Sequence, residues 1–107
     1  MIKTKQGVYL NRLHPVMYLA MIVISKKYNT LGLDFVITST YDSVHMEGSL
    51  HYEGCAIDVR TREITNSLEL GELVDSIRED LLALDKCFDV VLESTHLHIE
   101  YDIGKKR

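Results

Sequence analysis

The sequence predicts a small α+β domain, with two helices packed on a mainly antiparallel sheet. Three observations predict it: an apolar run of helical length that opens with proline, a second helix-spaced segment, and short strand-like segments that follow each of them. The 107 residues contain one proline and show no internal repeat or low-complexity stretch. We therefore expect a single domain over residues 1–107.

The first helix is predicted from about Pro15 to Tyr28. Proline suits the first turn of a helix, because the N–H that it lacks has no partner there. The apolar residues that follow form a wide stripe, so this helix is expected to be largely buried. These residues are Val16, Met17, Leu19, Ala20, Met21, Ile22, Val23 and Ile24. The segment "NTLG", with Gly32, is a typical helix end.

Two strands are predicted after this helix. The segment "DFVITST", residues 34–40, is rich in β-branched and aromatic side chains. The second strand, "CAIDVRT", covers residues 55–61, and a loop separates the two strands. Successive residues of a strand point to opposite faces, so Cys55 faces away from Asp58 and is expected in the core.

A second helix is predicted within residues 64–85, with Asn66 or Ser67 as its N-terminal cap. Its apolar residues recur at helical spacing, which predicts one buried face. They are Leu70, Leu73, Val74, Ile77, Leu81 and Leu84.

The last two strands are predicted in "FDVVLE" and "HLHIEYD", with a tight connection at residues 94–95. On the final strand His96, His98 and Glu100 share one face, because residues two apart point the same way. The alternate residues, Leu97, Ile99 and Tyr101, are expected to face the core.

Composition and charge exclude several classes of protein. The net charge of −4 argues against nucleic-acid binding, which needs a basic face. The longest apolar run, Val16–Ile24, is shorter than the roughly 20 residues of a membrane span, and it makes a poor signal peptide. We expect a cytoplasmic monomer without a signal peptide. Cys55 and Cys87 form no metal or disulfide pattern, so both are expected to be buried free thiols.

Two stretches carry most of the chemically active side chains. They are "SLHYEGCAIDV", residues 49–59, and "ESTHLHIEYD", residues 93–102. Four of the five histidines lie in or beside them: His45, His51, His96 and His98. Gly54 permits a left-handed turn that would fold His51 back toward Asp58.

An aspartate inside a strand is costly unless it is paired, and the small Ala56 leaves room beside Asp58. If the strand of Asp58 adjoins the last strand, His51, Asp58 and one late histidine converge. Two imidazoles, one carboxylate and one open position form the ligand set of a catalytic zinc site. Composition and spacing leave open the alternative of an ordinary polar surface without metal, and they do not identify a reaction.

A ten-residue motif in the first stretch resembles that of the zinc D-alanyl-D-alanine carboxypeptidases and L-alanyl-D-glutamate endopeptidases. The motif is S-x-H-x-x-G-x-A-x-D, and its positions here are Ser49, His51, Gly54, Ala56 and Asp58. The later "HLH" resembles the H-x-H element of a wider group that includes lysostaphin-type peptidases and the hedgehog signalling domain. The ending "HLHIEYD" is similar to compact phage and prophage members of the peptidase family.

The resemblance covers residues 36–102 and implies a hedgehog-like fold and one zinc ion per chain, held by His51, Asp58 and His98. Several peptidases of the family instead carry E-x-x-H with that histidine on zinc, and Glu93 to His96 fits this spacing. We favour His98, since "HIEY" matches the residues that follow the zinc histidine in related domains.

The resemblance also implies the chemistry, which is hydrolysis of peptidoglycan peptides that contain D-amino acids by a phage-type enzyme. Glu93 would be the general base, and His96 and His45 would stabilise the oxyanion. Glu100, on the same strand face as His98, is the competitor for the role of base but has no counterpart as a base in the family. Two alternatives stay open. One is a zinc-containing binding module of hedgehog-like fold without hydrolytic activity, and the other is an α+β domain without metal.

Overall fold

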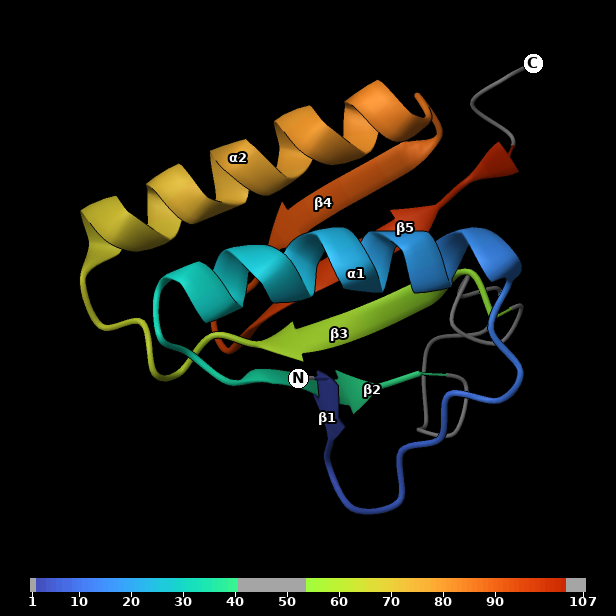
Figure 1. Cartoon of the computed structure of the whole chain (residues 1–107), viewed down its shortest axis with the longest axis horizontal. Helices are drawn as coiled ribbons and strands as arrows, with labels where there is room; N and C mark the ends of the chain where they lie inside the picture. Colours follow the sequence, from blue (N-terminus) through green and yellow to red (C-terminus); the bar gives the residue numbers. More distant parts are fainter. Residues whose placement is uncertain (1, 41–53, 104–107) are drawn as a thin grey trace.

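The computed structural model describes residues 2–40 and 54–103, which form a small α+β fold, as predicted (Figure 1). In chain order the elements are β1 (Ile2–Thr4), α1 (Pro15–Thr30), β2 (Phe35–Ser39), β3 (Ala56–Arg60), α2 (Ser67–Leu84), β4 (Phe88–Leu92) and β5 (His96–Tyr101). Both predicted helices and all four predicted strands are present within a residue or two of their expected ends. No helix in these two ranges is long and apolar enough to cross a membrane.

The strands form one mixed sheet in the order β1-β2-β3-β5-β4, with only β1 and β2 parallel to each other. The sequence does not predict β1, because its three residues are all exposed and show no apolar alternation. Pairing with β2 creates this strand, and Ile2 lies opposite Phe35. The mainly antiparallel sheet is otherwise as expected.

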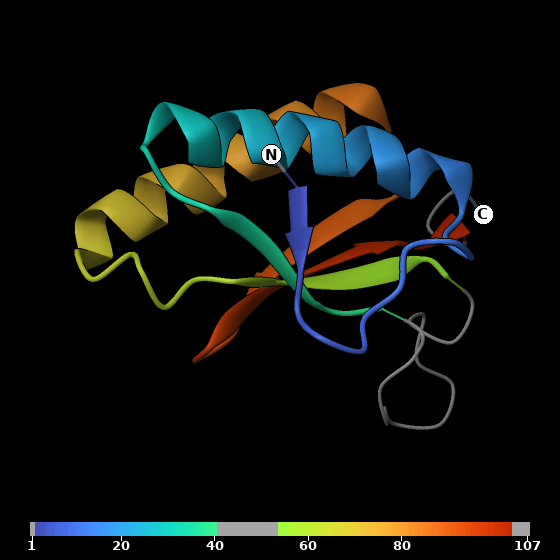
Figure 2. The same cartoon turned by 60° about the horizontal axis from the view of Figure 1, so that its bottom comes forward.

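Both helices cover the same face of the sheet (Figure 2). The strands turn their apolar residues toward the helices, and these side chains form the core with the buried faces of α1 and α2. Six fully buried strand residues belong to this core: Phe35, Ile37, Ile57, Val59, Leu97 and Ile99. The polar residues of the same strands therefore lie on the face away from the helices.

Helix α1 is less buried than its sequence predicts. His14 caps it, because Nδ1 of its ring accepts a hydrogen bond from the backbone N–H of Val16, at 3.2 Å. The buried residues follow one stripe: Met17, Ala20, Met21, Ile24, Ser25 and Tyr28. Leu19 and Ile22 are 51% and 47% exposed, so the expectation of a largely buried helix is wrong for them. The reason is that α1 packs on the sheet with one side only.

Helix α2 begins as predicted, because the Asn66 side chain accepts hydrogen bonds from the backbone N–H groups of Leu68 and Glu69. Its buried face consists of Leu73, Val74, Ile77 and Leu81, while Leu84 is 48% exposed.

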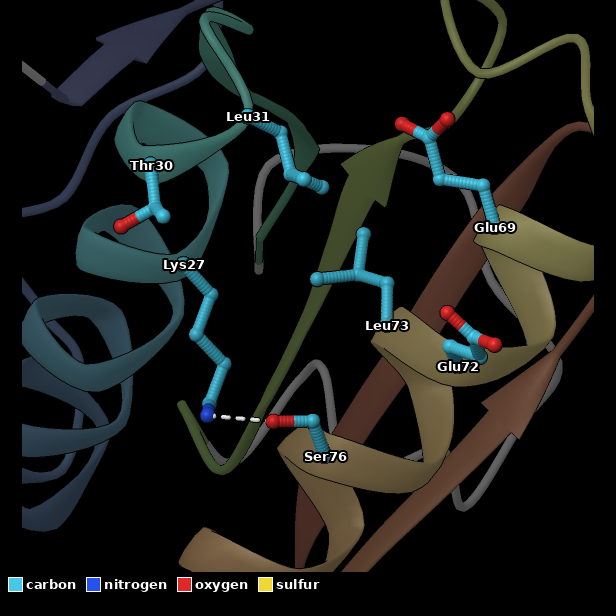
Figure 3. A pocket seen from close by; sticks show the side chains of 7 residues that line it. All are labelled: Lys27, Thr30, Leu31, Glu69, Glu72, Leu73 and Ser76. Atoms are coloured by element: carbon cyan, nitrogen blue, oxygen red, sulfur yellow. Dashed lines mark hydrogen bonds between the residues drawn. The ribbon is translucent and has the colours of Figure 1, made fainter.

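A hollow of about 340 Å³ lies between α1 and α2 (Figure 3). Lys27 occupies its edge and donates to Ser76 at 2.6 Å, and its ammonium group also pairs with Asp80 at 2.7 Å. Glu69 and Glu72 lie on the opposite wall. Because Lys27 is already paired, these contacts tie the two helices together, on the side of the sheet that carries no histidine of β5.

Candidate functional site

Strand pairing brings the two chemically active stretches together. β3 and β5 are antiparallel neighbours, with Asp58 opposite His98. Directly opposite residues of paired strands point to the same face. The two strands are thus the sheet neighbours on which the convergence of Asp58 with a late histidine depended. The helices do not cover this side of the sheet, which we call the open face (Figure 2). Among its side chains, four form what we call the histidine cluster: Asp58, His96, His98 and Glu100.

His98 is the centre of the cluster. Its Nδ1 lies 3.0 Å from Oδ1 of Asp58, and its Nε2 lies 2.9 Å from Oε1 of Glu100. The side chains of Asp58 and His98 are 13% and 20% exposed, so the contact is partly shielded from water. Each ring nitrogen thus faces one carboxylate, and the ring lies between the two acids.

The pKa of His98 is raised above its ordinary value of 6.5, first by the hydrogen bond with Asp58 and then by that with Glu100. Burial opposes this shift, because removal from water disfavours the charged ring. Carboxylates accept hydrogen bonds and do not donate them, so both contacts are complete only when both ring nitrogens carry hydrogen. The metal-free cluster therefore favours the imidazolium form of His98.

His96 lies beside the pair rather than within it. Its Nδ1 is 3.0 Å from the hydroxyl of Thr95, and its Nε2 is 3.7 Å from Oδ2 of Asp58. The ring thus turns Nε2 toward Asp58 but stays farther from it than the ring of His98. This arrangement suits a histidine that acts next to the ligand pair.

Glu93 follows β4 at the hairpin that leads into β5. Its backbone N–H donates to the carbonyl of His96 at 2.9 Å, across the tight connection predicted at residues 94–95. Glu93 and His96 are therefore opposite each other, and the pleat of the hairpin directs both to the open face. The side chain of Glu93 is exposed. Glu93 lies at the rim of the histidine cluster.

The backbone conformation and surroundings of Gly54 explain why the motif has glycine at this position. Its φ is +71°, in the left-handed region, as the sequence predicts. A β-carbon here would lie 2.4 Å from the carbonyl oxygen of Arg12, and the carbonyl of Gly54 accepts a bond from the N–H of His14 at 2.9 Å. Glycine is therefore needed where the chain enters β3, against the segment that leads into α1.

Ala56 and the cysteines also lie where the sequence predicts. Ala56 is fully buried on the open-face side of β3, opposite Glu100, and its methyl group leaves space for that longer side chain. Cys55 and Cys87 are both buried and are not linked by a disulfide. Cys55 faces the core rather than the cluster. His45 and His51 lie outside the described residues.

Two donor atoms in the described residues, Oδ1 of Asp58 and Nδ1 of His98, lie at a distance that suits neighbouring ligands of one zinc ion. Tetrahedral zinc with bonds of about 2.0–2.1 Å separates neighbouring donor atoms by roughly 3.3 Å. The 3.0 Å between Asp58 Oδ1 and His98 Nδ1 is close to this value. Within residues 2–40 and 54–103, no three His, Cys, Asp or Glu side chains form a metal-holding group. Because the His98 ring separates Asp58 from Glu100, one ion cannot contact all three, and a third ligand must come from another residue.

Comparisons with protein-family models, with curated proteins and with solved structures find no match to this chain.

One feature of the cluster is not predicted from the sequence, namely the hydrogen bond between Glu100 and His98. The i, i+2 spacing on β5 already puts both on one face, and this was the available signal. Only the distance between Oε1 of Glu100 and Nε2 of His98 shows that the two side chains are hydrogen-bonded. Arg60, opposite His96, adds a positive charge to the same face.

Proposed function

We propose that this protein is a zinc metallopeptidase that cleaves bacterial cell-wall peptides containing D-amino acids. The observation that supports this most is the contact between Asp58 and His98, two of the three expected ligands, at 3.0 Å on an open sheet face. These residues are 40 positions apart in the sequence. The resemblance to the D-alanyl-D-alanine carboxypeptidases and L-alanyl-D-glutamate endopeptidases supports the same reaction, with His51 as third ligand.

Each residue of the cluster has a role in this proposal. Zinc, when bound by Asp58 and His98, supplies the Lewis acidity that activates water and polarises the scissile carbonyl. Glu93, at the rim, accepts a proton from the attacking water and returns it to the leaving amine. Nε2 of His96 stabilises the oxyanion, with His45 as the second candidate for this role.

The substrate and setting belong to the same proposal. Peptidoglycan stem peptides are anionic, and Arg60 brings a cation to the face on which they would lie. The similarity of "HLHIEYD" to compact phage and prophage members of the peptidase family supports a phage-type enzyme. In this proposal the enzyme is made as a monomer in the cytoplasm of the bacterial host.

A zinc-containing binding module without hydrolytic activity is the second candidate. The position of Glu93 favours it, because this side chain is exposed and forms no hydrogen bond or ion pair with the cluster in the described part of the chain. The resemblance to the hedgehog signalling domain supports the same alternative.

The deciding experiment is hydrolysis of a D-amino-acid-containing wall peptide by wild type and by Glu93→Gln, each with measured zinc content. Glutamine keeps the size of the side chain but cannot accept the proton, so turnover should fall about 10²–10⁴-fold while zinc is retained. Glu79→Gln, an exposed glutamate on α2, is the matched control and should leave turnover unchanged.

Near-normal turnover by Glu93→Gln would remove this residue from the mechanism. Zinc-loaded wild type that cleaves no wall peptide would favour the binding module.

A further inference from the structure

Glu100 forms a hydrogen bond with His98, which the role of a general base or of a solvent-exposed acid would not require. Its Oε1 lies 2.9 Å from Nε2 of His98, on the side of the ring away from Asp58. The side chain of Glu100 is only 23% exposed, so water competes weakly for this hydrogen bond.

The neighbours directly opposite Glu100 in the sheet offer it no side-chain hydrogen-bond donor. Its directly opposite neighbours are Ala56 on β3 and Asp89 on β4. A methyl group and a carboxylate offer no donor, and a carboxylate directly opposite repels Glu100. His98 is two residues away on the same strand and the same face, and its ring N–H can satisfy the acid.

The hydrogen bond at one ring nitrogen decides which form of a neutral histidine is present. Glu100 and Asp58 can both only accept, so each favours hydrogen on the ring nitrogen that it faces. Nδ1 is the nitrogen that faces Asp58 at 3.0 Å. When a metal takes the place of the hydrogen between Nδ1 and Asp58, the contact with Glu100 keeps hydrogen on Nε2, so the ring has the form that binds the metal through Nδ1.

We propose that Glu100 is a positioning residue that orients His98 and holds its neutral ring in the Nε2–H form, so that Nδ1 binds the metal. This inference rests on the proposed zinc site. It also assigns different tasks to the two acids that compete for the role of base. Glu100 contacts His98 on the side opposite Asp58, whereas Glu93 lies at the rim beside His96 and keeps the role of base.

The first test is a zinc competition titration of wild type, Glu100→Gln and Glu100→Ala. Replacement of a carboxylate that accepts a hydrogen bond from a metal-binding histidine typically lowers metal affinity or activity by about 10–100-fold. We expect Glu100→Ala to lose zinc affinity within this range and Glu100→Gln to lose less, since its amide oxygen still accepts from Nε2. Asp89→Asn, which removes a negative charge from the position opposite Glu100, is the matched control and should change affinity less than about threefold.

The second test is ¹⁵N NMR of the His98 ring in zinc-loaded wild type, which does not depend on any variant folding. We expect hydrogen on Nε2 and metal on Nδ1. Metal on Nε2 would overturn the proposal, as would zinc affinities of both Glu100 variants within twofold of the wild-type value. Wild type that binds no stoichiometric zinc would instead reject the proposed function, and the positioning role with it.

Discussion

At the scale of single residues, the two histidines of β5 differ in what they face. His98 lies between two carboxylates, each within hydrogen-bond distance, whereas His96 approaches Asp58 only to 3.7 Å and bonds Thr95 on its other side. Both share one sheet face, so the difference comes from side-chain contacts rather than from strand direction. This difference ranks His98 ahead of His96 as a metal ligand.

The ranking predicts unequal costs of substitution. His98→Ala removes a direct donor and should lower zinc affinity more than about 100-fold, beyond the roughly 10–100-fold expected when a neighbour of the ligands is lost. His96→Ala should lower zinc affinity by no more than this roughly 10–100-fold. A zinc competition titration of both variants, with zinc stoichiometry measured at saturation, makes the comparison. The reverse ranking would assign the ligand to His96 and restore the E-x-x-H interpretation.

At the scale of elements, the hairpin of β4 and β5 and the neighbouring β3 form a rigid support for the cluster. β3 pairs with β5 from His96 to Glu100, and β4 pairs with it from Leu97 to Tyr101. A backbone fixed on both sides restricts side-chain positions, which is what a metal site or an active site needs. The entry into β3 is fixed separately, by the close approach of Gly54 to Arg12.

Gly54→Ala should therefore destabilise the fold more than an equivalent change elsewhere. Gly32→Ala is the matched control, because its φ of +72° is nearly the same but no atom lies within 4 Å of the added β-carbon. A left-handed conformation of a residue other than glycine costs about 1–3 kcal/mol, and Gly54→Ala must add the clash with the Arg12 carbonyl to this cost. Urea unfolding of the two metal-free variants measures the difference. Equal losses would show that the clash relaxes at no cost.

At the scale of the whole molecule, the two helices cover one face of the sheet (Figure 2). The histidine cluster lies on the other face, because strand residues alternate between the two faces. The core is complete without any residue of the cluster, since its members are outside the buried apolar group. Polar residues on this face of β3 and β5 keep some access to water and bond one another, so their desolvation cost is lower than it would be against the helices. Binding at this face adds stability to a fold that already has its core.

Zinc should stabilise the folded protein by mass action. In excess over the dissociation constant, each tenfold rise in free zinc should add about 1.4 kcal/mol to the free energy of unfolding. Thermal unfolding at several buffered zinc concentrations measures this dependence. Asp58→Asn should flatten it, because a charged donor is lost, whereas Asp89→Asn on the same face should keep it. A melting temperature of wild type that does not respond to zinc would contradict the proposed site.

The sequence by itself determined what depends on local geometry. Strand alternation predicted that His96, His98 and Glu100 share a face, and capping chemistry predicted Asn66 as the start of α2. These features depend on residues a few positions apart, so their spacing is visible in the chain.

Only the tertiary structure decided which distant residues meet. The register that sets Asp58 opposite His98 depends on how β3 and β5 pack against the helices, and no spacing within either segment contains it. The same is true of β1, which exists as a strand through its pairing with β2, and of Leu19, which is exposed because α1 packs on one side. Contacts between distant segments form through the packing of the whole core, and for this reason local patterns predicted the faces but not the partners.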